Sequence, residues 1–203
     1  GTFPGHPGRK RLDFIKVLLQ YSEEYERRHG NPLFHDWTAL NPTIVPLIVE
    51  GAHAAGLRVS CHIETATDFH NALIAGVDEI NHTPGLRPDR DDWTNVEIDR
   101  YKISKADATL AARRGTVVVT TFATAIARIA KATEGEAFRE WRELLIWNLG
   151  VLKEANVALA VGSDRYSETA VAEAMALDSL DVFSKADLLR MWCDTSSRTI
   201  FPT

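Results

Sequence analysis

The sequence predicts an α/β protein with the architecture of part of a parallel (β/α)8 TIM-type barrel. Five short apolar runs, each typical of a buried strand, alternate with longer stretches of helical pattern. Three of these runs end in residues that can bind metal: His62 in LRVSCHIE, His82 in VDEINHT and Asp164 in VALAVGSDR. Parallel β/α barrels carry their functional residues at the C-terminal ends of the strands, so these three residues are expected at one rim.

Cap and stop residues divide the chain into the expected elements. Thr65 and Asp68 have capping-box spacing and Gly76 follows the last helical residue, which predicts a helix from Thr65 to Ala75. The other helices are expected at Thr43–Ala55, Ser104–Gly115 and Glu136–Asn156 and from about Thr169 and Ser184 onward. The strands are expected at Leu12–Leu19, Leu57–His62, Val77–His82, Thr116–Ala123 and Val157–Arg165.

A closed barrel of this type needs eight strands, and this sequence predicts five. We therefore expect about five βα units in a single domain, residues 1–203, which is fewer than a closed barrel contains. The long charged stretch from Pro84 to Tyr101 is expected to be a functional loop at the rim. A second charged run is predicted to be a solvated helix face; it consists of Glu23, Glu24, Glu26, Arg27 and Arg28.

Strand alternation predicts which side chains face the centre of the barrel. Successive residues of a strand point to opposite faces. Arg58 and Ser60 therefore share a face with His62, and small residues share a face with Asp164, namely Ala158, Ala160 and Gly162. The bulky residues between them are expected to face the helices, so the pattern predicts a polar or small inner face and an apolar outer face.

Composition excludes several classes of protein. The 203 residues are 45% hydrophobic and 25% charged, with a net charge of -5, as in an ordinary globular domain. The acidic balance and the lack of a basic stripe predict no nucleic-acid partner. No apolar run is long enough to span a membrane, and the start of the sequence does not resemble a signal peptide. With only Cys61 and Cys193, no disulfide framework is expected, and we expect a reducing, cytoplasmic location.

The segments DFIKV, RVSCHIETATDFHNALIAGVDEINHTPG and ALAVGSDRY resemble strands four, five, six and eight of the amidohydrolase superfamily, closest to its imidazolonepropionase-like and prolidase-like branch. The resemblance extends through the terminal SSRTIFPT and implies that the chain is the C-terminal part of the barrel and lacks its first strands. It implies that His62 and His82 bind a divalent metal, usually zinc. It also implies that Asp164 binds metal and takes a proton from the attacking water, and that Lys16 is a candidate for carboxylation as a further ligand.

The chemistry of these residues suits that assignment. Imidazole nitrogens and a carboxylate are good zinc ligands, and a zinc-bound water supplies hydroxide near neutral pH. Lys16 is either a salt-bridged lysine or, if carboxylated, an anionic oxygen donor. The paired histidines of the family's first strand are missing, because no two histidines here lie two positions apart. We therefore expect one metal ion; His6 is a candidate replacement ligand but is more simply a loop residue.

Two functions follow from these residues. The first is a metal-dependent hydrolase that cleaves amide, ester, lactone or related bonds of a small molecule through a metal-activated water, with Asp164 as the base. The alternative is a truncated remnant, non-catalytic or weakly active, that binds metal or has a structural role. A five-stranded piece of a barrel exposes two sheet edges and an inner face, so a homo-oligomer is expected as well.

Overall fold

The computed structural model describes residues 12–35, 38–86, 88–92, 97–123, 126, 136–164 and 169–200. Its centre is a five-stranded sheet in which each strand pairs in parallel with the next along the chain, in the order β1-β2-β3-β4-β5. The strands are β1 (Phe14–Leu18), β2 (Arg58–His62), β3 (Glu79–Asn81), β4 (Val117–Thr120) and β5 (Ala158–Val161). Five parallel strands with helical connections confirm the predicted α/β fold and its match to part of a TIM-type barrel.

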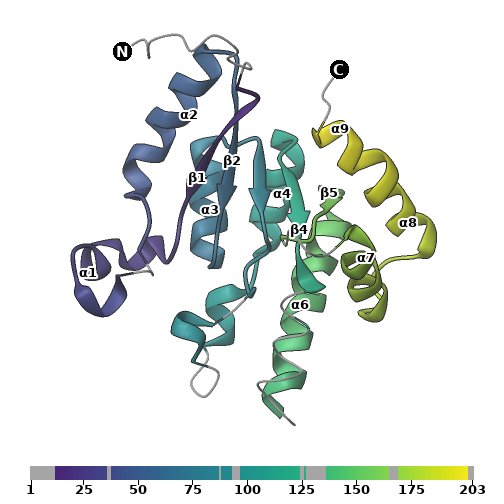
Figure 1. Cartoon of the computed structure of the whole chain (residues 1–203). Helices are drawn as coiled ribbons and strands as arrows, with labels where there is room; N and C mark the ends of the chain where they lie inside the picture. The colour runs from purple at the N-terminus through teal and green to yellow at the C-terminus, as the bar shows by residue number, and fades with distance from the viewer. Residues whose placement is uncertain are drawn as a thin grey trace.

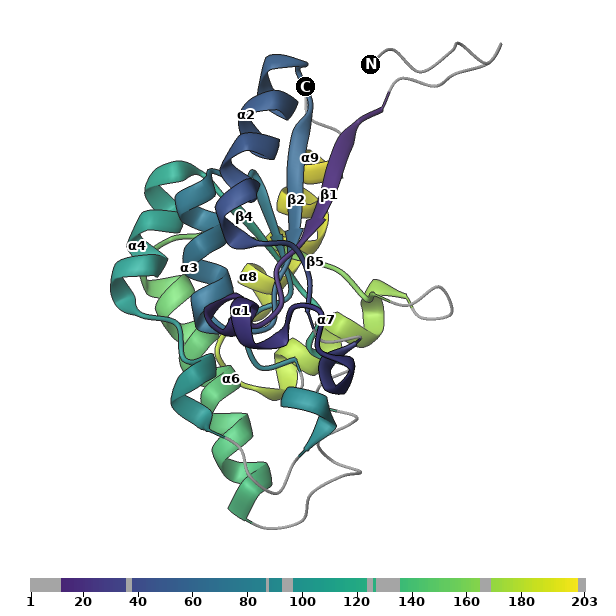
Figure 2. The same cartoon turned by 90° about the vertical axis from the view of Figure 1, so that its left-hand side faces the viewer.

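Helices connect the strands and cover one face of the sheet, as Figures 1 and 2 show. The longer ones are α2 (Val45–Ala54), α3 (Ala66–Ala75), α4 (Lys105–Arg114), α6 (Glu136–Glu154) and α7 (Ala170–Ser179). Short helices are α1 (Tyr25–Arg28), α8 (Lys185–Arg190) and α9 (Ser196–Ile200), with a π-helical turn (Met191–Thr195) joining the last two. Single 3-10 turns lie at Ser22–Glu24, Pro32–Phe34, Pro42–Ile44, Asp89–Asp91 and Ile98–Tyr101.

The strand register separates an apolar face from a polar one. One row across the sheet consists of Val17, Cys61, Ile80, Val118 and Leu159, none of them more than 4% exposed. This row faces the helices and packs in one core with residues such as Phe69 and Leu149. A neighbouring row lies on the opposite face and runs through Lys16, Ser60, Glu79, Val117 and Ala158. The alternation predicted for β2 is therefore confirmed, since Val59, Cys61 and Ile63 are all fully buried.

The helix starts and stops agree with the cap residues in the sequence. The Thr65 hydroxyl accepts a hydrogen bond from the Asp68 backbone N–H, and the Asp68 carboxylate accepts one from the Thr65 backbone N–H, which completes a capping box. Gly76 ends α3 with a φ of 86°. That left-handed conformation favours glycine. Ser104 and Gly115 bound α4 in the same way. The strands are shorter than predicted: β3 ends at Asn81, so His82 follows the strand, and β5 ends at Val161, three residues before Asp164.

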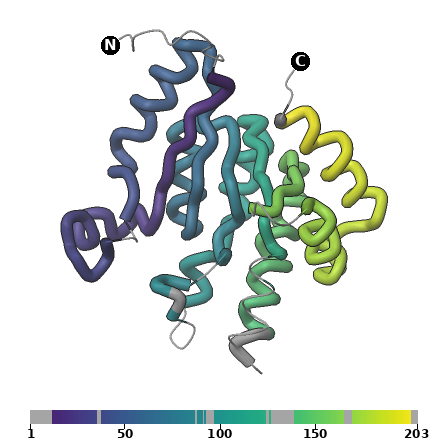
Figure 3. Tube along the Cα trace, in the orientation of Figure 1, coloured from purple at the N-terminus to yellow at the C-terminus, as the bar shows by residue number. Residues whose placement is uncertain are grey.

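The two edges of the sheet differ in their surroundings. Beyond β5 lie α7, α8 and α9 (Figure 3). The hydroxyl oxygen of Ser196 in α9 accepts a hydrogen bond from the backbone N–H of Val161 in β5 at 2.9 Å. At the other edge, Phe14 and Leu18 of β1 are 51% and 42% exposed. The fold therefore leaves apolar side chains of an edge strand open to solvent. Within the described residues, no helix combines the length and apolar character needed to cross a membrane.

Candidate functional site

His62 and His82 meet at the carboxyl rim, meaning the edge of the sheet where the parallel strands end. Their ring centroids lie 4.7 Å apart in a T-shaped arrangement. The register pairs His62 with Asn81, so His82 lies one residue beyond the position opposite His62. A left-handed backbone at His82, with a φ of 73°, interrupts the strand alternation there. The structure thus brings together two of the predicted ligands.

Each histidine has a polar partner through one ring nitrogen. Nε2 of His62 lies 3.3 Å from Oε1 of Glu64, and Nδ1 of His82 lies 2.6 Å from Oγ1 of Thr121. Glu64 is fully buried, and His82 is also buried. Such outer partners fix the orientation of an imidazole ring. Sequence reasoning did not identify Glu64 or Thr121, although the spacing of two residues between His62 and Glu64 was visible in the sequence.

Lys16 lies on β1, on the same face of the sheet as His62. It stands opposite Ser60 in the register, and Nζ is 3.5 Å from the Ser60 hydroxyl. Lys16 as a whole is exposed, but the surrounding side chains partly desolvate its amine. This desolvation lowers the pKa of the amine, and the negative charge of Glu79 acts in the opposite direction. A lowered pKa increases the fraction of neutral amine, which is the form that reacts with carbon dioxide.

Asp164 follows β5 as an exposed residue with a left-handed backbone, φ 51°. Its negative charge is close enough to Lys16 to act on the pKa of that amine. Among the residues that the structure describes, however, no three His, Cys, Asp or Glu side chains are grouped tightly enough to hold a metal ion. The donor types fit a divalent metal such as zinc, while the arrangement assembles only the two imidazoles.

The inner face also contains a cavity of about 380 Å³, lined by Phe14 and Arg58 at the start of β1 and β2 and by Asn81 and Val161 at the end of β3 and β5. Ser60 Oγ lies 2.9 Å from both Glu79 Oε1 and Asn81 Oδ1, and Asn81 donates to Glu79 at 2.7 Å. Arg58 reaches across this face and donates to the backbone carbonyl of Thr199 at 2.7 Å. The cavity therefore lies on the predicted inner face, lined by Arg58 and Ser60 as expected from their alternation with His62.

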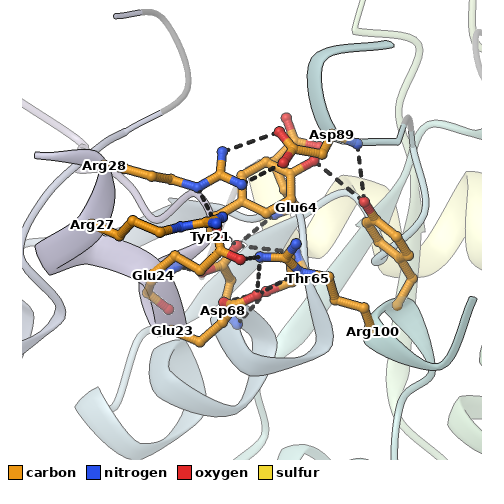
Figure 4. A network of polar contacts seen from close by, with 12 residues as sticks. Tyr21, Glu23, Glu24, Arg27, Arg28, Glu64, Thr65, Asp68, Asp89 and Arg100 are labelled. Carbon is orange, nitrogen blue, oxygen red and sulfur yellow. Dashed lines mark hydrogen bonds and ion pairs between the residues drawn. The ribbon is translucent and has the colours of Figure 1, made fainter. Parts of the chain in front are cut away.

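The buried carboxylate of Asp68 connects the loops that follow β1 and β2 (Figure 4). Asp68 Oδ2 accepts the backbone N–H groups of Tyr21, Glu64 and Thr65 at 2.9, 3.1 and 3.0 Å. Asp68 Oδ1 accepts the N–H of Ser22 at 2.8 Å. One fully buried side chain therefore ties the loop after β1 to the loop after β2.

The charged run that begins at Glu23 is not simply a solvated helix face, and in this respect the prediction was wrong. Arg28 is 1% exposed and forms ion pairs with Glu24 and Asp89, and its guanidinium lies 4.0 Å from the centre of the Tyr21 ring (Figure 4). Arg100 lies 4.7 Å from the centre of the same ring. Asp89 and Arg100 belong to the stretch Pro84–Tyr101, so these contacts anchor the described part of that loop beside the rim.

Three other described histidines, His29, His53 and His70, lie away from the pair. His53 and His70 sit on helices, where they contact Asp78 and Asp107 at 2.9 and 2.7 Å, and both are exposed. His29 contacts the Tyr25 hydroxyl in the loop region after α1. His6 lies outside the described residues, so its candidacy as a ligand stays a prediction.

Solved structures of hydrolases share this fold. No protein-family model and no curated protein matches the chain. A. niger ochratoxinase is 17% identical with a TM-score of 0.60, and covers 93% of this chain and 40% of its own. A prolidase complexed with N-methylphosphonate-L-proline is 19% identical with a TM-score of 0.55, over 80% of this chain and 38% of its own. An uncharacterized protein is 19% identical with a TM-score of 0.60, over 92% of this chain and 43% of that protein.

An amidohydrolase structure is 20% identical with a TM-score of 0.56, over 81% of this chain and 38% of that chain. These likenesses show that the chain shares the fold of these structures. The chain spans about two fifths of the length of these solved structures, from 38% to 43%.

Proposed function

We propose that this chain carries the metal-binding and catalytic residues of a metal-dependent hydrolase acting on amide, ester, lactone or related bonds of a small molecule. The observation that carries this proposal is the approach of His62 and His82, 4.7 Å between ring centroids, at the ends of neighbouring parallel strands. The carboxyl ends of barrel strands are where such folds place their chemistry. The fold of ochratoxinase and prolidase structures supports the same function.

Four residues would take part. His62 and His82 would hold one divalent ion, with Lys16 as a further ligand once carboxylated and Asp164 at the open side. The ion, when bound, would polarise the bond under attack and activate water. Asp164 is exposed and so can accept a proton from that water without first being desolvated.

The inner face of the sheet would position the substrate. Arg58, Glu79 and Asn81 offer a guanidinium, a carboxylate and an amide along the cavity below the rim. Phe14 and Val119 add apolar surface to the same cavity. A small substrate with both apolar and polar groups is therefore the class that this face suits.

The alternative proposal is a domain that binds metal or has a structural role without catalysis. The lack of a cluster of three ligands within the described residues favours this reading. It differs from the first proposal in predicting no turnover even when metal is bound.

Metal content and hydrolysis should be measured on the same purified protein. Zinc per chain would be determined after dialysis, and activated esters, lactones, dipeptides and amides would be assayed with zinc and with chelator. Turnover that depends on zinc and disappears in His62→Ala but not in His53→Ala supports the hydrolase. Bound zinc without turnover on any substrate supports the alternative, and a protein that binds no metal contradicts both metal roles.

A further inference from the structure

A carboxylate supports the His62 ring from within the protein. Glu64 is fully buried, and its Oε1 lies 3.3 Å from His62 Nε2. The carboxylate is therefore placed to accept a hydrogen bond from an Nε2–H group. Burial excludes competing water, so a hydrogen bond there orients the ring more firmly than one at the surface.

The backbone that carries Glu64 is itself held in place. The N–H groups of Glu64 and Thr65 both donate to Asp68 Oδ2, at 3.1 and 3.0 Å. Asp68 is also the N3 residue of the α3 capping box, so helix and loop share one anchor. Displacing Glu64 would break hydrogen bonds to a buried carboxylate, which carries a substantial cost.

From this geometry we propose that Glu64 is the positioning residue of His62. It accepts the Nε2–H hydrogen bond and thereby presents Nδ1 as the nitrogen that His62 offers to a ligand, because a neutral imidazole has one donor and one acceptor nitrogen. The orientation of the ring is a property of the metal-free protein. Its consequence for metal affinity rests on the proposed function.

The first test uses metal-free protein labelled with ¹⁵N in histidine. A ring N–H bonded to a buried carboxylate exchanges slowly with water and gives a downfield proton resonance. We expect this resonance from His62 Nε2, assigned by its loss in His62→Ala. It should disappear in Glu64→Ala and move upfield in Glu64→Gln, whose amide oxygen is a neutral and weaker acceptor.

The control is Glu173→Gln, which alters another fully buried glutamate that bonds to Phe122 and Ala123 and not to His62. This variant should keep the His62 resonance. If the resonance is absent from the wild type, or is the same in the wild type and in Glu64→Gln, the proposal is overturned. Because Glu64→Gln keeps the size and one acceptor, it decides the question even if Glu64→Ala does not fold.

The second test measures zinc affinity by competition with a chromophoric chelator. Loss of an outer partner typically weakens metal binding by about 10–100-fold, and we expect a loss in this range for Glu64→Ala and a smaller one for Glu64→Gln. An unchanged affinity in both variants would contradict the positioning role. A wild type that binds no zinc would contradict the proposed function, and the proton resonance alone would then decide the role of Glu64.

Discussion

The rings of His62 and His82 lie 4.7 Å apart although the two residues are not register partners. Strict alternation would turn the side chain of His82 toward the same face as Ile80, which is fully buried against the helices. A left-handed backbone at His82 breaks the alternation and allows its ring to meet that of His62. For a residue other than glycine this conformation is costly, and such strain is found most often at functional sites.

The first prediction concerns zinc binding by His62 and His82. His62→Ala and His82→Ala should each weaken zinc binding by at least the roughly 10–100-fold that loss of an outer partner costs, since each would remove a direct ligand. His70→Ala is the matched control, because His70 is exposed and paired with Asp107. Zinc titration of the three variants would check this, and wild-type affinity in both His62→Ala and His82→Ala would exclude the site.

Asp164 is expected to matter for turnover more than for folding or metal. Asp164→Asn keeps the size of the side chain but removes the proton acceptor, so activity should fall by about 100-fold or more. The residue is exposed, so the melting temperature should change little. Steady-state kinetics and thermal unfolding of the same preparation would show the difference; near-normal turnover would rule out Asp164 as the base.

Lys16 should form a carbamate when bicarbonate is present. Desolvation lowers the pKa of its amine, which favours the neutral, reactive form. Labelled bicarbonate should therefore give a ¹³C carbamate resonance in the wild type that is missing in Lys16→Arg, because the guanidinium stays protonated. Lys105→Arg, at an exposed lysine paired with Glu154, should keep the resonance. A resonance that survives Lys16→Arg would show that another group reacts.

The sequence predicted the sheet well because its signals are local. Val17, Cys61 and Ile80 follow the alternation of a buried strand, and Thr65 with Gly76 marks the ends of α3. The site was only partly predictable. The approach of His82 to His62 depends on one backbone angle, and the burial of Arg28 depends on Asp89, 61 residues away. No local pattern encodes contacts of that kind.

Glu173 should make stability depend on pH. Burial raises the pKa of its carboxyl above the ordinary value of 4.5, despite the opposing hydrogen bonds from Ala123 and Phe122. The folded state therefore holds this proton more tightly than the unfolded state. The stabilisation that the protonated Glu173 carboxyl contributes is complete below pH 4.5. It is lost as the pH rises through the raised pKa of the folded state. Glu173→Gln cannot titrate, so it should lack this component.

The measurement is the difference in unfolding free energy between wild type and Glu173→Gln, by urea denaturation across this pH range. The wild type should lose stability relative to the variant as the pH rises from 4.5. Asp187→Asn serves as a comparison of opposite sign at more acidic pH. Hydrogen bonds from Ser184 lower the pKa of Asp187 below its ordinary value of 3.8, so its contribution to stability should be lost as the pH falls through the folded pKa. A pH-independent difference between wild type and Glu173→Gln would show that the carboxyl titrates normally.

The open edge at β1 leads to the last prediction, which concerns assembly. Phe14 and Leu18 expose apolar surface on the edge strand and face the same side as Lys16. Exposed apolar side chains on the edge strand of a sheet favour association with another chain. We therefore expect a homo-oligomer in solution.

Light scattering coupled to size exclusion at micromolar concentration would measure the mass. The wild type should be at least twice the 22.6 kDa of one chain. Phe14→Asp should shift the population toward the monomer, because a charge on the contact must be desolvated to associate. Leu47→Asp is the control, since Leu47 is also exposed, at 67%, but lies on α2. A folded wild-type monomer would show that the edge is tolerated in water and would contradict the expected assembly.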